Sequence, residues 1–521
     1  MKKISILIAA LATSLLLKTG CSSDFMDTVP SNAASIVTLT EDFDRAKTIM
    51  VGTNRARFRF GFSLGGSTIQ QFDFGEHSTL FVLEYLADDF FATGLSYGPH
   101  WIQNPQLHNT SPATVLVAQP WFFMYRMIDN VNQVINRVDD IPGLTPAQKG
   151  FLLGNGLVYR AHYHHMLVQI YAQAVHHSPN NPGVVINTGL GGEALPRSTV
   201  REVYDQIIQD LNDALVALET AGVMDGSNAI TPRDGTRHNI AFASPAVVRG
   251  LLSRVYLDLH DFQRAATYAR AARVGVPLMT RAQFRDGFLT RNAEWMWGSI
   301  VPSDEAQNFA TFPAEMTNGT EFGTFYPAAW GFDNAISRQL VDAAHPDDAR
   351  FGDLLRPHRL GFGSDADVNL RYDKYRWTGG LGSAFDLVYM RGAEMLLNEA
   401  EALAMIGGQE AAVRALLTEL LTARVNATYA AKVNAMNNAQ LLAEVKMQRR
   451  KEFWGEGRRF FDLKRRGEAL DRRHAITGSG QNAGNMRTVQ VDDPRSGYWV
   501  YLIPTRELTN NPYMTQNNYP Q

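Results

Sequence analysis

The stretch Ser244–Pro277, SPAVVRGLLSRVYLDLHDFQRAATYARAARVGVP, decides the fold class of this chain. Its apolar and small residues recur at steps of three and four, which is the period of an amphipathic helix. Small residues at such positions allow two antiparallel helices to approach closely. We therefore predict a helix pair here, within a mainly α-helical protein.

The spacing in this stretch resembles that of a tetratricopeptide helix pair, at Leu252, Ser253, Tyr256, Ala265, Ala269, Ala272 and Pro277. A second pair is predicted where Met390–Ala404 is followed by Gln409–Ala423, joined through Gly407-Gly408, although its small residues are less regular. Stacked pairs form a curved scaffold, so one functional hypothesis is a bare scaffold that docks partner proteins.

Further helices are predicted on both sides of the first pair. The same periodicity marks Pro120–Val138, Phe151–Val175 and Thr199–Leu218. Thr199 and Glu202 have the spacing of a capping box, which fixes the start of the third helix. Asn132 falls on the apolar stripe of the first helix, so we expect it to have a buried hydrogen-bond partner.

Irregular, aromatic-rich segments interrupt the helices. Residues 281–378 are longer than an inert loop and contain one alternating stretch, Glu294–Val301, that predicts a strand. Aromatic residues gather at Phe309–Phe332 and again at Phe90–Trp101. Loops on a rigid helical frame commonly carry binding sites, so these segments are the candidates for ligand binding.

The chain begins like a bacterial lipoprotein. Lys2-Lys3 precede an apolar run, Ile4–Leu17, which is too short to span a bilayer at roughly 20 residues, and Gly20 precedes Cys21. Cys21 is the single cysteine, and we predict that it carries a lipid anchor. Lys18 departs from the aliphatic residue usual at that place, which leaves an ordinary signal peptide or an uncleaved anchor as alternatives.

Composition excludes several partner classes. The 49 basic and 52 acidic residues of the 521 nearly cancel, so a nucleic-acid partner is not expected. A single cysteine cannot form an internal disulfide.

Residues 22–40 are polar and contain Pro30, which is typical of a flexible tether before a folded body that starts near Glu41.

Six short motifs in order give the chain a resemblance to the SusD/RagB lipoprotein family. They are Asp24-Phe25-Met26-Asp27 behind the cysteine; Trp121, Tyr125, Ile128 and Asn132; Arg160-Ala161 with Tyr163 and Leu167-Val168; Met390-Arg391-Gly392-Ala393-Glu394 with Leu396-Leu397-Asn398 and Ala400-Glu401-Ala402; Arg449 to Glu452, Glu456 to Arg459 and Phe461 to Arg465; and Leu502-Ile503-Pro504, Glu507, Asn511-Pro512, Gln516-Asn517 and Tyr519. Gln448, near a usual acid, and Arg466, in place of a tryptophan, depart from the pattern.

The charged motif residues have a structural interpretation. Arg391, Glu394, Arg449, Glu452 and Asp462 are expected to form buried ion pairs between helices rather than to contact ligand.

The resemblance implies a nutrient receptor on the outer face of the outer membrane. Such a receptor captures an oligosaccharide, or in some members a peptide, for a SusC-like TonB-dependent transporter, and it has no catalytic activity and no cofactor. It also implies one compact unit of tetratricopeptide-like helix pairs with an irregular, loop-rich ligand-binding portion and a few short strands. The expected division is a signal peptide at 1–20, a lipidated tether at 21–40, an N-terminal helical part at 41–280 and a C-terminal part at 281–521.

Sugar binding needs flat aromatic platforms beside planar amides or charges. Residues of these types in the candidate loops are Tyr97, Trp101, Asn104, Tyr326 and Trp330, to which we add Arg59. They are chosen by type and place, because no family motif specifies them. Arg55, Arg57 and Arg59 together could suit an acidic sugar, but we interpret them as a solvated basic face.

Catalysis and metal binding are the competing hypotheses. Asp88-Asp89 or Asp304-Glu305 could supply the two carboxyls of a glycosidase, yet adjacency in sequence does not give the required separation of roughly 5–10 Å. His162 and His165 would share one helical face, in a cluster with His164, His176 and His177. Without a carboxylate at ligand spacing, we interpret these histidines as packing or surface residues and expect no metal.

Overall fold

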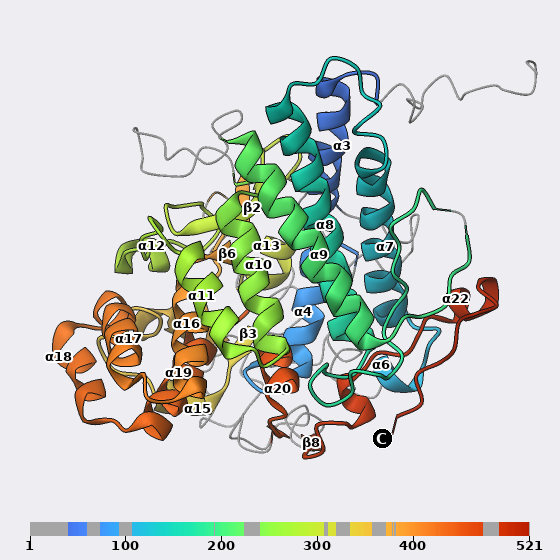
Figure 1. The fold of residues 1–521 in the computed structure, drawn as a ribbon. Helices are drawn as coiled ribbons and strands as arrows, with labels where there is room; N and C mark the ends of the chain where they lie inside the picture. Colours follow the sequence, from blue (N-terminus) through green and yellow to red (C-terminus); the bar gives the residue numbers. More distant parts are fainter. Residues whose placement is uncertain are drawn as a thin grey trace, which may run out of the picture.

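The architecture in the computed structural model is mainly helical, which confirms the predicted fold class (Figure 1). The structure describes residues 40–59, 73–92, 107–191, 193–222, 240–306, 311–318, 334–356, 371–377, 379, 382–472 and 489–519. None of the helices within these ranges is both long and apolar enough to cross a bilayer.

The first helices of the chain include the longest ones. In chain order these first helices are α3 (Phe43–Ala56), α4 (Glu76–Leu86), α6 (Leu107–Thr110), α7 (Val115–Ile135), α8 (Pro146–Tyr171) and α9 (Val200–Ala221), of which α7, α8 and α9 are the longest. Helix α8 lies between α7 and α9 and packs along both, while α4 lies near the centre of the molecule (Figure 1).

Two of these helices begin earlier than predicted. Helix α7 starts at Val115 and contains Pro120 in its interior, so proline does not mark its first turn. Helix α8 starts at Pro146 because Thr145 and Gln148 form a capping box around a polar first turn that lacks the apolar period. The capping box of Thr199 and Glu202 at α9 is present as predicted.

Asn132 has the buried partners that its place on the apolar stripe predicted. Its amide donates to the carbonyl of Asn187 at 3.1 Å, and its Oδ1 accepts a bond from Arg160 at 3.3 Å. Arg160 in turn forms a bidentate pair with Asp210, at 2.7 and 2.8 Å. A single polar network therefore joins α7, α8, α9 and the segment after α8.

Both predicted helix pairs are present. The first consists of α10 (Pro245–Asp258) and α11 (Phe262–Ala272), and the second of α16 (Gly392–Ile406) and α17 (Glu410–Arg424). Helix α11 also packs on α16, which brings the two pairs together. Gly407 and Gly408 have φ values of +77° and +67°, a conformation that favours glycine, and so permit the turn between α16 and α17.

The strands are short and antiparallel. Strand β2 (Trp295–Val301) confirms the predicted strand and pairs with β6 (Phe385–Arg391). A second sheet has the order β1-β3-β5-β4, from β1 (Phe90–Ala92), β3 (Asn334–Ile336), β5 (Arg371–Tyr372) and β4 (Leu355–Arg356). The third sheet joins β7 (Leu470–Asp471) to β8 (Gln490–Val491).

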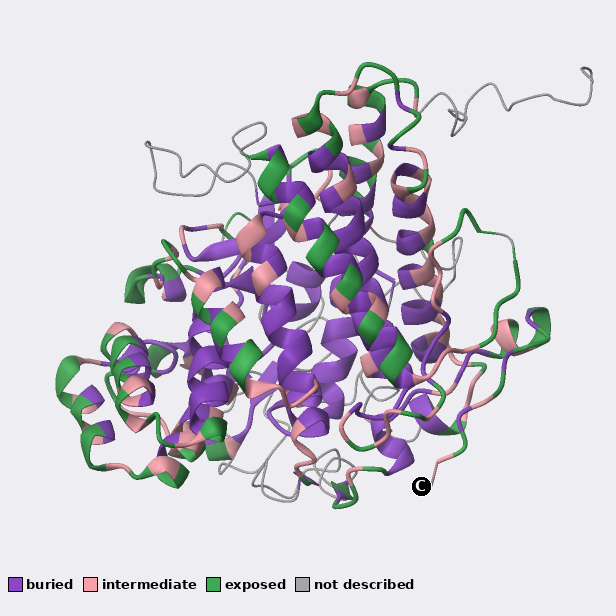
Figure 2. Ribbon diagram, in the orientation of Figure 1, coloured by how far each residue is buried: buried purple, intermediate pink, exposed green. Residues whose placement is uncertain are grey.

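Shorter elements complete the described chain. They are α12 (Arg281–Arg285), α13 (Phe312–Met316), α15 (Arg338–Asp342), η4 (Gly352–Leu354), α18 (Ala427–Ala430), η6 (Ala431–Ala435), α19 (Asn438–Glu452), α20 (Arg459–Arg466), η7 (Gly497–Trp499) and α22 (Thr505–Asn510). Figure 2 shows that the centre of the molecule, including α4, α8 and α16, is almost wholly buried, with exposed faces on the outer helices.

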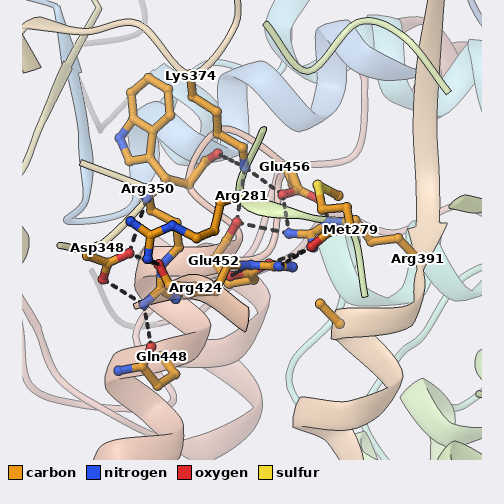
Figure 3. Close-up of polar contacts among 12 residues, drawn as sticks. Met279, Arg281, Asp348, Arg350, Lys374, Arg391, Arg424, Gln448, Glu452 and Glu456 are labelled. Carbon is orange, nitrogen blue, oxygen red and sulfur yellow. Dashed lines mark hydrogen bonds and ion pairs between the residues drawn. The ribbon is translucent and has the colours of Figure 1, made fainter. Parts of the chain in front are cut away.

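Charged residues are buried at the centre of the C-terminal part, around Glu452 at the end of α19 (Figure 3). Its carboxylate pairs with Arg424 at 2.8 Å, Arg391 at 2.8 Å and Arg350 at 3.2 Å. Glu294, just before β2, pairs with both Arg391 and Arg424. We call these five residues the Glu452 network, and all of them are buried.

The network is charged rather than neutral. Burial alone would raise the pKa of Glu452, but the guanidiniums of Arg424, Arg391 and Arg350 hold it well below its usual value. Because the five residues come from segments far apart in sequence, the network ties β6, α17, α19 and the residues before β2 together. Breaking a buried ion pair leaves an uncompensated charge, so such a network tolerates little change.

The buried ion pairs predicted at the motif residues are confirmed. Glu394 pairs with Arg254 at 2.6 Å, and Arg449 pairs with Asp462 at 2.9 Å. The two departures from the family pattern also have partners inside the protein. Gln448 accepts a bond from Arg350 at 2.6 Å, and Arg466 pairs with Glu401 at 2.6 Å.

Replacing Glu452 with Gln should lower the free energy of unfolding by about 3–5 kcal/mol, because three guanidiniums lose their shared anion. Urea denaturation of the purified protein measures this. Glu419→Gln is the matched control, since Glu419 is 48% exposed and lies 3.4 Å from Arg273. That change should cost less than about 1 kcal/mol. Equal effects of the two substitutions would contradict the importance given to the network.

Candidate ligand-binding site

The two aromatic-rich segments adjoin the same pair of strands. Ala92, the last residue of β1, pairs with Asn334, the first residue of β3. The chain beyond Ala92 continues into residues 93–106, and the chain that enters at Asn334 comes from residues 319–333. The ends of both segments are therefore fixed side by side at the same end of the β1–β3 pair.

Asn318 and Asn334 close the second segment at its base. The backbone N–H of Asn334 donates to Oδ1 of Asn318 at 2.7 Å, and Nδ2 of Asn318 donates to the carbonyl of Asn334 at 3.1 Å. The same Nδ2 lies 3.0 Å from the carbonyl of Tyr372 on β5 and 3.1 Å from Oδ1 of Asp373. We call these four residues the asparagine clamp, and all four are fully buried.

Helices on both sides hold the clamp in place. The side chain of Asn334 donates to the carbonyl of Glu315 in α13 at 2.7 Å and accepts a bond from the hydroxyl of Tyr85 in α4 at 3.0 Å. Each polar atom of the Asn334 side chain thus has a protein partner. A base of this kind is rigid because moving it would leave buried polar groups unsatisfied.

The segment after α19 connects the sheet to the Glu452 network. Trp454 stacks on Phe90 of β1 with ring centroids 4.7 Å apart, and its indole N–H donates to the carbonyl of Asp89 at 2.9 Å. Its ring also meets Tyr372 of β5 edge-on at 4.6 Å. Since Trp454 follows Glu452 by two residues, the ion pairs of the core fix the position of the strands that carry the candidate loops.

Family comparisons agree with this architecture. A model described as the SusD family matches residues 367–520, and one described as starch-binding, associating with outer membrane, matches residues 85–223. Together they match more than half of the chain.

The chain belongs to the SusD family. No curated protein matches it by sequence.

Solved structures share the SusD fold over nearly the whole length. A SusD superfamily protein of Bacteroides thetaiotaomicron is 19% identical, with a TM-score of 0.73 over 92% of this chain and 100% of that one. A SusD-like carbohydrate binding protein of Bacteroides vulgatus is 22% identical, with a TM-score of 0.73 over 91% and 97%. A laminarin binding SusD-like protein is 20% identical, with a TM-score of 0.63 over 92% and 99%. At these identities the likeness concerns the fold alone.

Most of the predicted ligand residues lie outside the described part of the SusD-like chain. Tyr97, Trp101 and Asn104 belong to residues 93–106, and Tyr326 and Trp330 to residues 319–333. The predicted lipid attachment site, Cys21, also lies outside it. What the structure provides is the shared base from which the two segments start.

Arg59 is the predicted ligand residue that the structure describes. It is half-buried beyond the end of α3, and within the described ranges its guanidinium has no hydrogen-bond or ion-pair partner. The end of α3 contacts the start of α4, through Glu76 N–H and the carbonyl of Arg57, whereas β1 follows the other end of α4. Because α4 has 11 residues, it is about 16 Å long, and the contact with α3 and strand β1 lie at its opposite ends. The structure therefore does not bring the backbone of Arg59 to the β1–β3 pair.

The interpretation of the three arginines as a solvated basic face is wrong for Arg57. Its guanidinium is fully buried, pairs with Glu76 at 2.7 Å and lies over the ring of Tyr389 at 3.2 Å. The alternating spacing could not reveal this, because the partners come from α4 and β6. The Arg55 side chain is 49% exposed and pairs with Glu305 at 2.7 Å, so it does lie on a solvent-exposed surface.

The adjacent carboxylates Asp88 and Asp89, considered for catalysis, both pair with arginines. Asp88 accepts two bonds from Arg459, at 2.6 and 2.9 Å, and Asp89 pairs with Arg450 at 2.6 Å. Burial would raise the pKa of Asp88, but Arg459 brings it down to about 2. A general acid of a glycosidase needs a raised pKa, so Asp88 has the wrong electrostatics for that role.

The three histidines on α8 contact different partners. His162 contacts Glu76 at 3.0 Å, and His165 contacts Asp258 at 2.7 Å. His164 accepts the backbone N–H of Asn187 at 3.1 Å. Within the described ranges, no three His, Cys, Asp or Glu side chains are arranged to hold a metal ion.

Sequence reasoning missed the asparagine clamp. Its members follow no helical or strand period, and Asn318 contacts Tyr372 and Asp373, which are more than fifty residues away in the chain. The available signal was local: Asn318-Gly319 and Asn334 flank the aromatic-rich segment, and asparagine and glycine are common where loops begin and end.

Asn318→Ala should lower the free energy of unfolding by about 2–3 kcal/mol, because it leaves the Asn334 N–H and the Tyr372 carbonyl without their buried partner. Thermal and urea denaturation measure the change. The control is Asn510→Ala at the exposed end of α22, which should change stability by less than about 0.5 kcal/mol. A cost for Asn318→Ala as small as the control's would show that the clamp does not stabilise the fold.

Glu315, beside the clamp, should make stability depend on pH. Burial raises its pKa to about 8 from a usual value of 4.5, and its Oε1 has no hydrogen-bond partner among the residues that the structure describes. The folded state therefore retains a proton that the unfolded state releases above pH 4.5. Between about pH 4.5 and 8, the free energy of unfolding should fall with rising pH by about 1.4 kcal/mol per unit through this group.

The measurement is the difference in unfolding free energy between the wild type and Glu315→Gln across this range. Other titrating groups cancel in the difference, which should decline with rising pH and level off above about pH 8. A difference that stays constant from pH 5 to 8 would mean that Glu315 is not protonated in the folded protein.

Proposed function

We propose that this protein is a cell-surface receptor that captures an oligosaccharide between residues 93–106 and 319–333. The observation that carries the proposal is the pairing of Ala92 with Asn334, which fixes the ends of both segments side by side. In a member of the SusD family, two aromatic-rich segments with a common rigid base suit ligand binding better than an internal structural role.

The residue types in these segments suit a sugar. Tyr97, Trp101, Tyr326 and Trp330 offer flat apolar faces for the C–H surfaces of a pyranose ring. Asn104 can donate to and accept from hydroxyl groups. Arg59 remains a prediction: its guanidinium, which has no partner among the described residues, would contact a hydroxyl or an acidic group of the ligand only if the ligand extends from β1 to the other end of α4.

The comparisons support carbohydrate as the ligand class. One matching family model is described as starch-binding, and solved relatives of the same fold include a laminarin binding protein and a surface glycan-binding protein of Bacteroides fluxus. These names belong to those proteins, and the particular glycan of this chain is a separate question.

The proposal places the receptor on the outer membrane through a lipid on Cys21, with a SusC-like TonB-dependent transporter as its partner. Residues 1–20 would be removed as a signal peptide, and residues 21–40 would form the tether to residues 41–280 and 281–521, which together would form one compact unit. A tether of this kind keeps the receptor near the transporter at high effective concentration. The supporting observation is the family model described as associating with outer membrane.

The test is binding of the mature chain, without lipid, to an array of oligosaccharides and peptides, followed by calorimetric titration of the positives. Trp101→Ala and Trp330→Ala should each weaken binding to the recognised glycan at least about tenfold, equivalent to 1.4 kcal/mol. Tyr513→Ala is the matched control, because Tyr513 is an exposed aromatic residue close to α22 in sequence and belongs to neither segment.

Retained affinity in both tryptophan variants would move the site elsewhere. Binding to peptides alone would favour a peptide receptor, cleavage of a bound glycan would indicate an enzyme, and silence on the array would favour a docking scaffold.

Cys21→Ala should release the protein from membranes, because an acyl anchor cannot form without the thiol. The measurement compares wild type and variant in membrane pellets washed with sodium carbonate, which removes proteins held only by a partner. The wild type should remain in the pellet and the variant should be washed away. A variant that stays with the washed membrane would point to an uncleaved anchor.

A further inference from the structure

A groove of about 460 Å³ lies between α7, α22 and residues 185–195. It shares no residue with the asparagine clamp or with the segments proposed to bind glycan. Trp121, Phe122 and Tyr125 of α7 form an aromatic wall, and Leu190 and Leu195 line the opposite side. Its volume lies within the range of pockets that bind small ligands or single protein side chains.

The groove is preformed. Tyr125 donates its hydroxyl proton to the carbonyl of Val185 at 3.0 Å, and Asn511 donates to the carbonyl of Leu195 at 2.9 Å. Asn187 donates to Asp129 at 2.6 Å. These bonds attach both ends of residues 185–195 to the helices that they face, so an occupant would not have to order the groove first.

Exposed apolar side chains belong to the groove lining or follow it closely in sequence. Leu190 is 47% exposed, Leu195 36% and Tyr513 60%, and Tyr513 follows the groove residue Asn511 by two positions. Two exposed leucines in the lining of one groove, with an exposed tyrosine two residues from a lining residue, are typical of a surface that meets another protein, whereas single exposed residues elsewhere need no explanation.

The groove also carries negative charge that no ion pair among the described residues neutralises. Asp129, Glu193 and Glu507 line it, and within the described ranges none of the three has an ion-pair partner. Glu507 instead accepts neutral donors, the indole N–H of Trp121 at 3.3 Å and the amide of Asn511 at 3.1 Å. The buried carboxylates of the Glu452 network, in contrast, are all neutralised by arginines.

Cations near the groove lie at its edge rather than among its lining residues. Arg506 places its guanidinium 5.2 Å from the ring centroid of Phe122, and Arg126 lowers the pKa of Asp129 less than burial raises it. The ring of Phe122 thus already accepts a guanidinium, and Asp129 would be stabilised as an anion by a further cation.

We propose that this groove docks a basic segment of a partner protein, with an arginine or lysine side chain between the three carboxylates and an apolar neighbour against Leu190, Leu195 and Tyr513. Charge complementarity selects the basic side chain, and the exposed apolar edge selects a protein segment over a free amine.

The first test uses the purified mature chain and an array of immobilised hexapeptides of randomised sequence. Bound peptides should be enriched in arginine or lysine beside a large apolar residue. Asp129→Asn and Glu193→Gln should each weaken binding of the selected peptides about two- to fivefold, the range for partly exposed ion pairs. Asp213→Asn, an exposed carboxylate on α9, should leave binding unchanged. Added salt should weaken binding further.

The second test locates the partner in cells that make the full chain. A photo-crosslinking phenylalanine analogue at Leu190 should capture a segment with a basic residue near the crosslink, and the same analogue at Val216, which is 67% exposed on α9, should not. Substituting Asp129 and Glu193 together should reduce the yield at Leu190 severalfold.

The proposal is overturned if the array shows no preference for basic peptides, if the carboxylate variants bind as the wild type does, or if crosslinking at Leu190 yields nothing or no more than at Val216. Failure of the glycan titration would leave these outcomes unaffected, because the groove and the loop segments use different residues.

Discussion

A carboxylate buried among three arginines is the constraint on which the rest of this structure depends. Glu452 ends α19, and its partners come from β6, α17 and the segment that carries Arg350. Separating any of these segments from Glu452 would leave buried charges only partly neutralised, so the segments are most stable when they are buried together. This requirement fixes the relative positions of the second helix pair, the β2–β6 sheet and α19 more tightly than apolar packing alone would.

The same constraint extends to the candidate binding site. Two residues after Glu452, Trp454 stacks on β1 and meets β5, while Tyr372 of β5 donates to the carbonyl of Arg350 at 2.6 Å. The asparagine clamp then closes the segment that precedes β3. The Glu452 network, the short sheet and the asparagine clamp thus connect the core, one after another, to the two loops proposed to hold sugar.

Local patterns in the sequence predicted much of the frame. The helix pairs, the strand at Glu294–Val301 and the capping box at Thr199 follow from spacing. The buried ion pairs were expected, from the chemistry of buried charge, at residues that the family resemblance singled out. Arg57 and the asparagine clamp did not follow, because their partners are distant in sequence and no periodicity connects them. The start of α7 at Val115 was missed because Pro120 lies inside that helix. The start of α8 at Pro146 was missed because its polar first turn lacks the apolar period. The ligand residues were proposed by type alone, and the structure describes only the base of their loops.

The most direct test of the account is a crystal structure of the mature chain with an oligosaccharide selected from the array. The account predicts that the sugar lies between residues 93–106 and 319–333, against at least one of Trp101 and Trp330, beyond the Ala92–Asn334 pair. A sugar bound in the α7–α22 groove, or at any site that contacts neither segment, would contradict it.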